Sequence, residues 1–255
     1  MKSSLRKRSS DQPLVSIITA VFNDVEHITE TIQSIINQKY DNIEYIIIDG
    51  GSTDGTGKII EKFNDRIDYW VSEPDQGIYD AWNKGILQAK GEWISFLGSG
   101  DLFYNDSIQV YINAIRTEAI KPDFVSSRVR FVNNRRRVVR VWGESFLWSA
   151  FKKYMAIAHV GAFHHESLFK KYGLFNSTYR SSGDYEFFMR CGAHLKTVFV
   201  DKITADVIVG GISHGYEGLI ENYHIQRQYG AGILPAGFRL WLSYAKRFIR
   251  PLVYG

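Results

Sequence analysis

The sequence contains a single cysteine, Cys191, so no disulfide can form within the chain, and this indicates a reducing compartment. It also has little continuous hydrophobicity. No apolar stretch follows the basic start, which argues against a secretory signal. Apolar runs such as residues 45–48 are far shorter than the roughly 20 residues that span a bilayer. We therefore expect a cytoplasmic protein that is soluble or attached only to the inner surface of the membrane.

Positive charge is concentrated at the two ends of the chain. The net charge is +4, but residues 1–12 carry about +3 and residues 238–255 about +4, so the middle is slightly acidic. A nucleic-acid-binding protein more often carries its basic residues on the folded domain, beside aromatic side chains that stack on bases. We therefore expect no nucleic-acid partner.

Length and composition predict one compact α/β domain with a tail. The chain has 255 residues, of which 45% are hydrophobic. It is therefore too long to be a small protein that needs disulfides or metals to fold, and too apolar to be disordered. We expect a basic disordered tail over residues 1–12, a folded domain over 13–214 and a helical extension over 215–255.

Apolar runs and helical spacing alternate through the first half. Buried strands are predicted at residues 14–22, 44–48, 67–71 and 93–97, with helices at 25–38, near 59–63 and at 78–89. Asp24 is the expected N-cap of the first helix. This alternation predicts a Rossmann-like, mostly parallel sheet with right-handed crossovers and helices on both faces.

The second half is more mixed. Residues 124–141 predict an antiparallel hairpin that turns at Asn133 and Asn134 and carries several arginines. Helices are expected at 166–172 and 185–194, short strands at 197–200 and 206–209, and two helical pieces after Gly215.

Polar and acidic loops follow the four predicted parallel strands, at residues 23–24, 49–54, 73–77 and 98–101. In such sheets ligands bind beyond the carboxyl ends of the strands. A carboxylate such as Asp49 can accept hydrogen bonds from a base or a ribose, and Phe22 offers a face for stacking. Asp101 has room beside it for a divalent cation. For any one aspartate, a turn or capping role is the alternative.

Several signatures of other enzymes are missing. The glycine-rich residues 50–57 have neither the Lys-Ser/Thr of a phosphate-binding loop nor the G-x-G-x-x-G spacing of a dinucleotide site. No C-x-x-C, H-E-x-x-H or G-x-S-x-G pattern occurs. ATPase, NAD-dependent, zinc-hydrolase and serine-hydrolase activities are therefore unsupported.

Four motifs occur in order: VSIITAVFN (15–23), IIDGGSTDGT (47–56), SEPDQGIYDAWNKG (72–85) and GEWISFLGSGD (91–101). Together they resemble family 2 glycosyltransferases, most closely the bacterial exopolysaccharide branch with its colanic acid-type enzymes. The resemblance implies a GT-A fold, a nucleoside-diphosphate sugar donor, Mg²⁺ or Mn²⁺, and inversion at the anomeric carbon. It further implies a donor-binding half over 13–101, a catalytic half over 102–214, and a glycan or polyprenyl-diphosphate-linked acceptor in surface polysaccharide synthesis.

The resemblance assigns donor binding to five residues of the first three motifs: Phe22, Asn23, Asp49, Asp75 and Asn83. Phe22 falls on an aromatic position near the donor base, and Asp49 on the first acidic residue of the family's Asp-Asp-Gly-Ser. Gly50 stands where the second acidic residue is expected, so a contact made from that position would be missing.

The resemblance also implies a metal site. Asp101 matches the last aspartate of the family's D-x-D, but Gly98 and Gly100 stand at the partner positions. One protein carboxylate then remains, so the ion would be held weakly without the donor diphosphate. His214 is a second candidate ligand for the metal or a phosphate, with a structural role as the alternative.

The segment SGDYEFFMR (182–190) resembles the family's catalytic-base segment. Asp184 is the expected base, which the helix dipole helps to keep ionised and which needs no unusual pKa to act, and Glu186 is second. The alternative for Asp184 is an N-cap. His159 lies where the family often has a histidine on the acceptor side, so acceptor binding and a polar niche both stay open. His164 and His165 are expected to be exposed at a helix start.

Three further features have two interpretations each. Residues 238–252 have the spacing of an amphipathic helix with basic residues, which suits an anionic membrane surface or docking on the domain. The arginine-rich hairpin is a solvated ribbon or a contact for lipid-carrier phosphates. Trp82 is expected in the core rather than on a sugar.

Two other functions remain open. A nucleotidyltransferase also combines a Rossmann-like sheet with metal-binding carboxylates, but residues 22–25 lack its basic, glycine-rich phosphate loop. A sugar-nucleotide-binding homologue that has lost catalysis is the other, because glycines stand at positions 50, 98 and 100.

Overall fold

The structure is a computed structural model that describes residues 12–210 and 217–254, with side chains as far as Tyr244. Its first half contains β1 (Val15–Val21), α1 (Ile28–Ile36), β2 (Ile43–Asp49), α2 (Thr56–Lys62), β3 (Tyr69–Ser72), α3 (Ile78–Gln88) and β4 (Trp93–Phe96). The four strands pair in parallel in the order β3-β2-β1-β4. The predicted alternation of strands and helices is confirmed.

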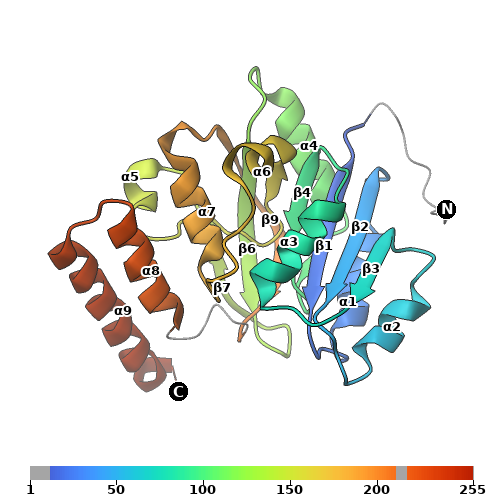
Figure 1. Ribbon diagram of the computed structural model, residues 1–255, viewed down its shortest axis with the longest axis horizontal. Coiled ribbons are helices and arrows are strands. Elements are labelled where there is room, and N and C mark those ends of the chain that lie inside the picture. The colour runs from blue at the N-terminus through green and yellow to red at the C-terminus, as the bar shows by residue number, and fades with distance from the viewer. Residues whose placement is uncertain (1–11, 211–216, 255) are drawn as a thin grey trace.

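The second half extends the same sheet. It contains β5 (Leu102–Phe103), α4 (Ser107–Thr117), β6 (Phe124–Val132), β7 (Val138–Trp142), α5 (Trp148–Phe151), β8 (Phe163–His165), α6 (Glu166–Tyr172), α7 (Gly183–Cys191) and β9 (Thr197–Ile208). β8 runs antiparallel to both β4 and β6, whereas β9 runs parallel to β6. A single curved sheet therefore joins the two halves, with helices on both faces (Figure 1).

The hairpin over 124–141 is confirmed, because β6 and β7 pair antiparallel around a turn that begins at Asn133. The two short strands predicted at 197–200 and 206–209 are one strand, β9. Ser127 pairs with Val200 and Arg128 with Ile203, so residues 201–202 bulge out of the ladder while the strand continues. Their polarity interrupts the apolar pattern without ending the strand.

The first helix begins later than predicted. α1 starts at Ile28, and its N-cap is His27 rather than Asp24. Asp24 is not a capping side chain, because its Oδ1 lies 2.6 Å from Nδ1 of His27. The expected cap is therefore wrong, and the carboxylate fixes the histidine ring in front of the helix instead.

The C-terminal extension forms two helices, α8 (Glu217–Gln228) and α9 (Ile233–Tyr254), as predicted. The break falls at residues 229–232. Pro235 lies in the first turn of α9, where its missing N–H breaks no helical hydrogen bond. Among the described residues, no helix combines the length and hydropathy that crossing a membrane requires.

The sheet separates two apolar layers. Alternate residues of β1 enter different layers: Ile17 packs with α1 and α4, and Ile18 packs with α3, α6 and α7. Both isoleucines are fully buried, which explains why these strands are continuous apolar runs. Trp82 is 6% exposed and belongs to the second layer, which confirms its place in the core.

Gly91 provides a test of how tightly β1 and β4 approach. A Cβ built there would lie 2.6 Å from the backbone nitrogen of Ser16, whereas at Gly237 in α9 it would meet nothing within 4 Å. Gly91→Ala should lower the free energy of unfolding by about 1–3 kcal/mol. The control Gly237→Ala should leave stability unchanged or raise it by up to ~1 kcal/mol. Urea denaturation measures both, and equal effects would contradict the tight approach.

Candidate active site

The carboxyl ends of β1, β2, β3 and β4 form one edge of the sheet, and hydrogen bonds join the loops that leave it. Asn23 donates its backbone N–H to Ser52 Oγ (2.7 Å), and its Oδ1 accepts the N–H of Thr53 (2.9 Å). The φ of Asn23 is 47°, a conformation that asparagine adopts more readily than most residues. Asn23 thus joins the first two loops, and its contact with a donor stays a prediction.

Asp49 is fully buried at the end of β2. Its Oδ1 accepts a hydrogen bond from Ser52 Oγ (2.5 Å) and its Oδ2 one from Ser72 Oγ (2.5 Å). The N–H of Ser52 lies 3.2 Å from both oxygens. Asp49 therefore ties the ends of β2 and β3 together. A donor contact by Asp49 stays a prediction, and it requires these serines to move aside.

Phe22 and Asp75 lie side by side at this edge. The Phe22 side chain is 62% exposed, as a ring that stacks on a base must be. A Cβ built at Gly50 would lie 2.6 Å from Asp75 Oδ2 and 3.3 Å from the Phe22 ring. Asp75 thus occupies the space of a side chain at Gly50 and brings a carboxylate there from the third loop. Sequence reasoning missed this replacement, because it counted Gly50 only as a lost contact.

Asn83 makes two hydrogen bonds to the backbone of Phe175. Its Nδ2 donates to the carbonyl oxygen (2.8 Å) and its Oδ1 accepts the N–H (3.0 Å). Asn83 therefore fastens α3 to the segment between α6 and α7. Its donor contact stays a prediction.

Asp101 is 7% exposed. Oδ1 accepts the N–H of Ile208 (3.0 Å), whereas Oδ2 lies 3.1 Å from where a Cβ at Gly98 would stand. The backbone of Gly98 also acts on this carboxylate as a hydrogen-bond donor. Burial raises the pKa of Asp101 to about 7, because desolvation outweighs the hydrogen bonds that favour the charged form. The carboxylate of Asp101 is thus held in a buried environment of low polarity.

These residues fit a weakly held divalent cation. Within the described ranges, no three His, Cys, Asp or Glu side chains form a ready metal cluster. Mg²⁺, however, commonly binds through one or two carboxylates together with substrate phosphates and water. Oδ2 of Asp101 can serve as that one ligand. His214, the second predicted ligand, lies outside the described residues.

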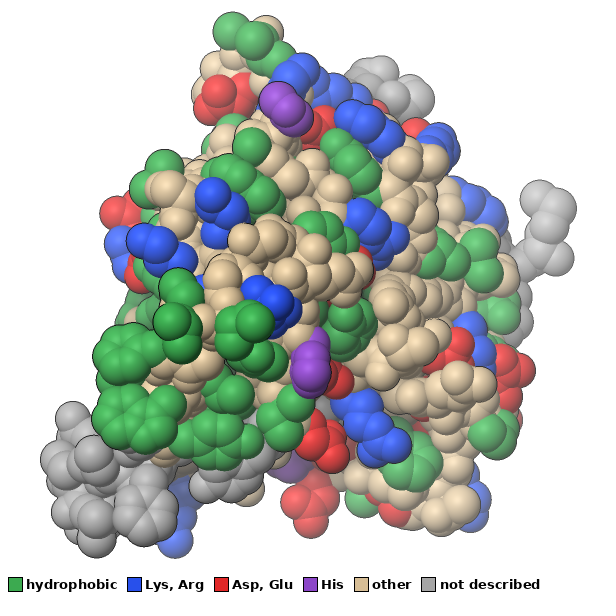
Figure 2. Space-filling view, turned by 60° about the vertical axis from the view of Figure 1, so that its left-hand side comes forward, with side chains coloured by type: hydrophobic (Ala, Val, Ile, Leu, Met, Phe, Trp, Pro, Cys, Tyr) green, Lys and Arg blue, Asp and Glu red, His purple; other side chains and the backbone are tan. Residues whose placement is uncertain are grey.

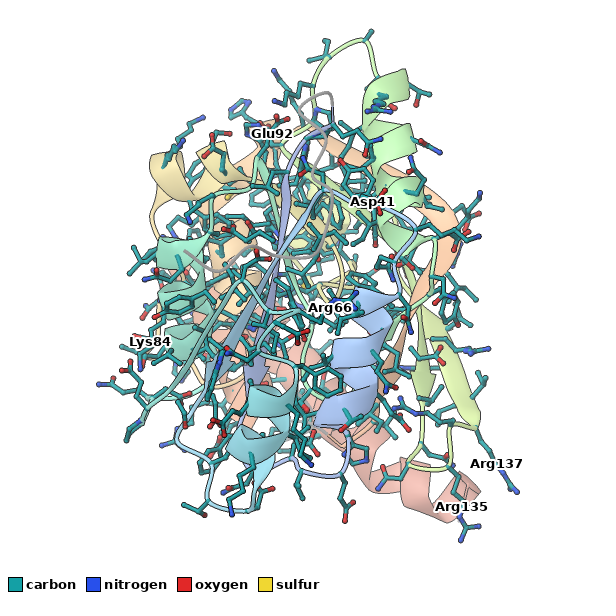
Figure 3. All side chains as sticks on the ribbon, turned by 90° about the vertical axis from the view of Figure 1, so that its right-hand side faces the viewer. Asp41, Arg66, Lys84, Glu92, Arg135 and Arg137 are labelled. Carbon is teal, nitrogen blue, oxygen red and sulfur yellow. The ribbon has the colours of Figure 1, made fainter. Side chains whose placement is uncertain are left out.

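Arg136 brings a positive charge beside Asp101. At the tip of the β6–β7 hairpin its side chain turns back to the sheet, where Nη1 donates to the Gly100 carbonyl (2.9 Å) and the guanidinium pairs with Glu30. Its neighbours Arg135 and Arg137 point away from the molecule (Figure 3). The sequence shows an arginine run, but not which member of it faces the site.

Asp184 lies in the first turn of α7, where Ser182 is the N-cap, so the N-cap interpretation of Asp184 is wrong. Oδ1 accepts hydrogen bonds from Tyr79 Oη (3.1 Å) and from the N–H of Tyr185 (2.8 Å). The side chain is 19% exposed. Burial raises the pKa of Asp184 to about 6. Desolvation outweighs the helix terminus and both hydrogen bonds.

Glu186, the second candidate base, is engaged elsewhere. It is 5% exposed, its Oε2 lies 3.1 Å from Nη2 of Arg190, and its Oε1 accepts a hydrogen bond from Tyr229 Oη (2.7 Å). Both oxygens therefore hold α7 to its own last turn and to the end of α8. A catalytic role for Glu186 stays a prediction.

His159 and His164 are both buried beside Asp184. His159 stacks on Phe96, the last residue of β4, and its Nε2 lies 3.2 Å from Nε2 of His164. His164 is fully buried in β8, so the expectation of an exposed side chain is wrong for it. His165 does begin a helix, because it caps α6 by accepting the N–H of Ser167. The acceptor-side role of His159 stays a prediction.

The predicted residues gather along one edge. Asp49 and Asp101 follow parallel strands, and Asp184 reaches the same edge through Tyr79 in the first turn of α3. An exposed aromatic ring and two buried or partly buried carboxylates thus lie at the carboxyl edge of an α/β sheet, which is where such sheets commonly bind nucleotides.

The chain belongs to glycosyltransferase family 2, because the model of the family Glycosyl transferase family 2 matches residues 16–175. An uncharacterized glycosyltransferase of Mycobacterium tuberculosis is 29% identical over 217 residues, covering 78% of this chain and 77% of that protein. A PGL/p-HBAD biosynthesis glycosyltransferase of Mycobacterium bovis is 31% identical over 182 residues, covering 70% of each.

Solved structures show the GT-A fold. S. aureus TarS 1–349 in complex with UDP-GlcNAc matches with a TM-score of 0.67 at 19% identity, covering 93% of this chain and 73% of that one. The mannosyltransferase PcManGT from Pyrobaculum calidifontis, in complex with GDP-Man and Mn²⁺, matches with a TM-score of 0.63 at 18% identity, covering 92% and 71%. The chain spans 43% of the longer S. aureus TarS chain. The predicted fold and family are confirmed.

The raised pKa of Asp184 predicts that this side chain, when ionised, destabilises the folded protein. Because its folded pKa of about 6 exceeds the ordinary 3.8, its contribution to stability is complete below pH 3.8 and is lost as the pH rises through 6. Asp184→Asn should therefore raise the free energy of unfolding by ~2 kcal/mol at pH 8 and by much less at pH 4.5. Urea denaturation at both pH values measures this, and a gain independent of pH would contradict it.

Proposed function

We propose that the protein is an inverting glycosyltransferase that moves a hexosyl group from a nucleoside-diphosphate sugar to a glycan or polyprenyl-diphosphate-linked acceptor in bacterial surface polysaccharide synthesis. The observation that carries the proposal is the geometry of Asp184. Its Oδ1 accepts hydrogen bonds from Tyr79 and from the backbone of Tyr185, whereas no other described residue donates a hydrogen bond to Oδ2, and the side chain is 19% exposed. A general base needs that arrangement.

In this mechanism Asp184 removes a proton from the acceptor hydroxyl. Its free Oδ2 takes the proton while the acceptor oxygen attacks the anomeric carbon from one face of the sugar. A pKa of about 6 leaves Asp184 ionised at pH 7, yet makes it a stronger base than an ordinary aspartate. Attack opposite the leaving group inverts the anomeric configuration.

The chain's other site residues act on the donor. Phe22 stacks on the base, and Asp75 beside it accepts a hydrogen bond from the base or the ribose. A divalent cation bound to Asp101 would neutralise the charge that develops on the leaving nucleoside diphosphate. Arg136, fixed on the Gly100 carbonyl, adds a permanent positive charge at the same place.

The comparisons suggest which substrates to try. A relative acts in PGL/p-HBAD biosynthesis, and the structural neighbours hold UDP-GlcNAc or GDP-Man, the latter with Mn²⁺. Thermal unfolding with each donor, with and without Mn²⁺, identifies the donor that this chain binds, because ligand binding stabilises the folded state.

With that donor, Asp184→Asn and Asp101→Ala should each lower transfer by at least ~100-fold, because the first removes the base and the second a leaving-group contact. The control is Asp41→Asn. Asp41 is an exposed aspartate before β2, at the opposite end of the strands, and should have no effect (Figure 3). Release of nucleoside diphosphate measures transfer.

Three outcomes would contradict the proposal. Substantial turnover by either variant removes that residue from the mechanism. Release of pyrophosphate instead of nucleoside diphosphate indicates a nucleotidyltransferase. Donor binding by the unmodified protein without release, across acceptors, indicates a homologue that has lost catalysis.

The start of α9 supports the lipid-linked part of the proposal. Ile233, Leu234, Phe238 and Trp241 are between 60% and 84% exposed, and Figure 2 shows apolar side chains gathered on this part of the surface. Beside them, a pocket of about 410 Å³ between α5, α8 and α9 is lined by Lys152, Lys153 and Arg239, among others. An apolar face next to cations suits an anionic membrane.

The double variant Phe238→Ser, Trp241→Ser should lower binding to vesicles of phosphatidylglycerol and phosphatidylcholine by ~10-fold or more, because it removes two interfacial aromatic side chains. Ile120→Ser is the control, since Ile120 is 67% exposed but lies after α4. Co-sedimentation measures binding. If both variants bind as the unmodified protein does, α9 is not a membrane contact.

A further inference from the structure

The ring nitrogens of His164 and His159 form a chain that ends at Asp184. Nδ1 of His164 lies 3.3 Å from the carbonyl oxygen of Ile94, and Nε2 of His164 lies 3.2 Å from Nε2 of His159. Nδ1 of His159 lies 4.0 Å from Oδ2 of Asp184. This Nδ1 is buried and has no hydrogen-bond partner among the described residues.

The partners of these nitrogens determine which of them carry protons. Burial lowers the pKa of His159 to about 3 and that of His164 well below its usual value, so each ring is neutral and carries one proton. The backbone carbonyls of Ile94 and Ala162 both act on His164, and that of Ile94 lies within hydrogen-bond distance of Nδ1. Because a carbonyl oxygen only accepts, this contact assigns the proton of His164 to Nδ1 and leaves Nε2 as an acceptor. His159 must then donate its Nε2–H to His164, which leaves Nδ1 of His159 as a lone pair.

That lone pair faces an oxygen that cannot donate to it while Asp184 is ionised. Two acceptors repel each other, and a separation of 4.0 Å is too long for a hydrogen bond. Once Oδ2 carries a proton, the same pair becomes a donor and an acceptor. A contact of this kind tightens when the substrate is bound or the proton moves.

We propose that His159 is a positioning residue whose Nδ1 accepts a hydrogen bond from protonated Asp184, and so holds the proton on Oδ2 after the acceptor hydroxyl delivers it. The inference rests on the proposed function for its catalytic meaning. The proton passes from the acceptor hydroxyl to Asp184 Oδ2, the bond from the acceptor oxygen to the anomeric carbon forms, and the bond to the phosphate oxygen breaks with its electron pair. Both histidines keep their own protons.

The other groups around the pair act on different atoms. Tyr79 from α3 and the Tyr185 N–H both donate to Oδ1 of Asp184. Glu221 from α8 adds a negative charge nearby, while its carboxylate accepts the N–H groups of residues 180–182. Around His159, apart from Asp184 and His164, the described ring contacts are aromatic: Trp82, Phe96, Phe175 and Phe188.

The first experiment reads the tautomers directly. In ¹⁵N-histidine-labelled protein without ligand at pH 7.5, the NMR signals of His159 should show a proton on Nε2 and those of His164 a proton on Nδ1. His159→Phe and His164→Phe assign the signals. A proton on Nδ1 of His159 would overturn the proposal, because that nitrogen could then only donate to Asp184. This measurement requires neither donor nor acceptor.

The second experiment measures the contact itself. Asn at position 184 imitates the protonated aspartate, because its Nδ2–H can donate to Nδ1 of His159. The rise in Tm that Asp184→Asn produces at pH 8 should be ~2–4 °C smaller in a His159→Phe background, as expected for one lost hydrogen bond. His165→Phe is the matched control. It removes the cap of α6 but faces Trp93 rather than Asp184, so it should lower the Tm without changing the Asp184→Asn shift.

The third experiment links the contact to turnover. In His164→Phe, the ring of His159 loses the partner that fixes its tautomer. Its Nδ1 can then carry the proton and donate a hydrogen bond to Asp184. The acid limb of the rate profile should then move to lower pH by ~1 unit as the plateau falls. A lower plateau with an unmoved acid limb would overturn the proposal and leave His159 only a packing role. The same follows if Asp184→Asn raises the Tm equally with and without His159→Phe. If no donor is turned over, but the tautomers and the Tm shifts are as expected, the proposed function fails while the contact between His159 and Asp184 stands.

Discussion

The hydrogen bond from Tyr79 to Asp184 joins the two halves of the chain at the carboxyl edge of the sheet. Tyr79 lies in the first turn of α3, directly after the donor-side loops, and Asp184 lies in α7, 105 residues later. Gly183 makes the approach possible, because a Cβ there would lie 2.9 Å from the Tyr79 ring. Asn83 fastens the same helix to Phe175. The position of Asp184 is thus set by how α3 packs against α7.

The three carboxylates at this edge differ in how they are hydrogen-bonded. Asp49 is completely buried, and both of its oxygens are satisfied by serines, so its charge holds two strand ends together. Asp101 accepts hydrogen bonds only from backbone N–H groups, and the hydrogen bonds that other described residues donate to Asp184 both go to Oδ1. Burial raises the pKa of both, to about 7 and about 6. A carboxylate left incompletely satisfied in a buried place is destabilising, and a functional site is where such an arrangement is expected.

The sequence predicted what periodicity and local motifs control. Apolar runs located β1, β2 and β4, because strands buried on both faces have little polarity to interrupt them. The edge strand β3 is only partly buried, and it starts two residues later than predicted. The position of Asp184 at a helix start followed from its motif, but its raised pKa did not, since that depends on what the rest of the fold packs around it. Asp75 beside Gly50, Arg136 on Gly100 and His164 beside His159 were missed for the same reason. The first two are contacts between loops far apart along the chain, and the third depends on how the segment before β8 turns both histidine rings inward.

The two glycines of the reduced D-x-D change the chemistry of the site rather than only weakening it. Gly100 has a φ of +88°, a conformation that glycine adopts without strain, and its carbonyl accepts the hydrogen bond from Arg136. Gly98 leaves the space that Asp101 Oδ2 faces. Two aspartates at these positions would add two negative charges beside a carboxylate that is already hard to ionise. With glycines there, a single carboxylate and one fixed guanidinium lie close together. Under the proposed function, this guanidinium would provide part of the positive charge that a leaving diphosphate requires, and the demand on a bound cation would be correspondingly smaller.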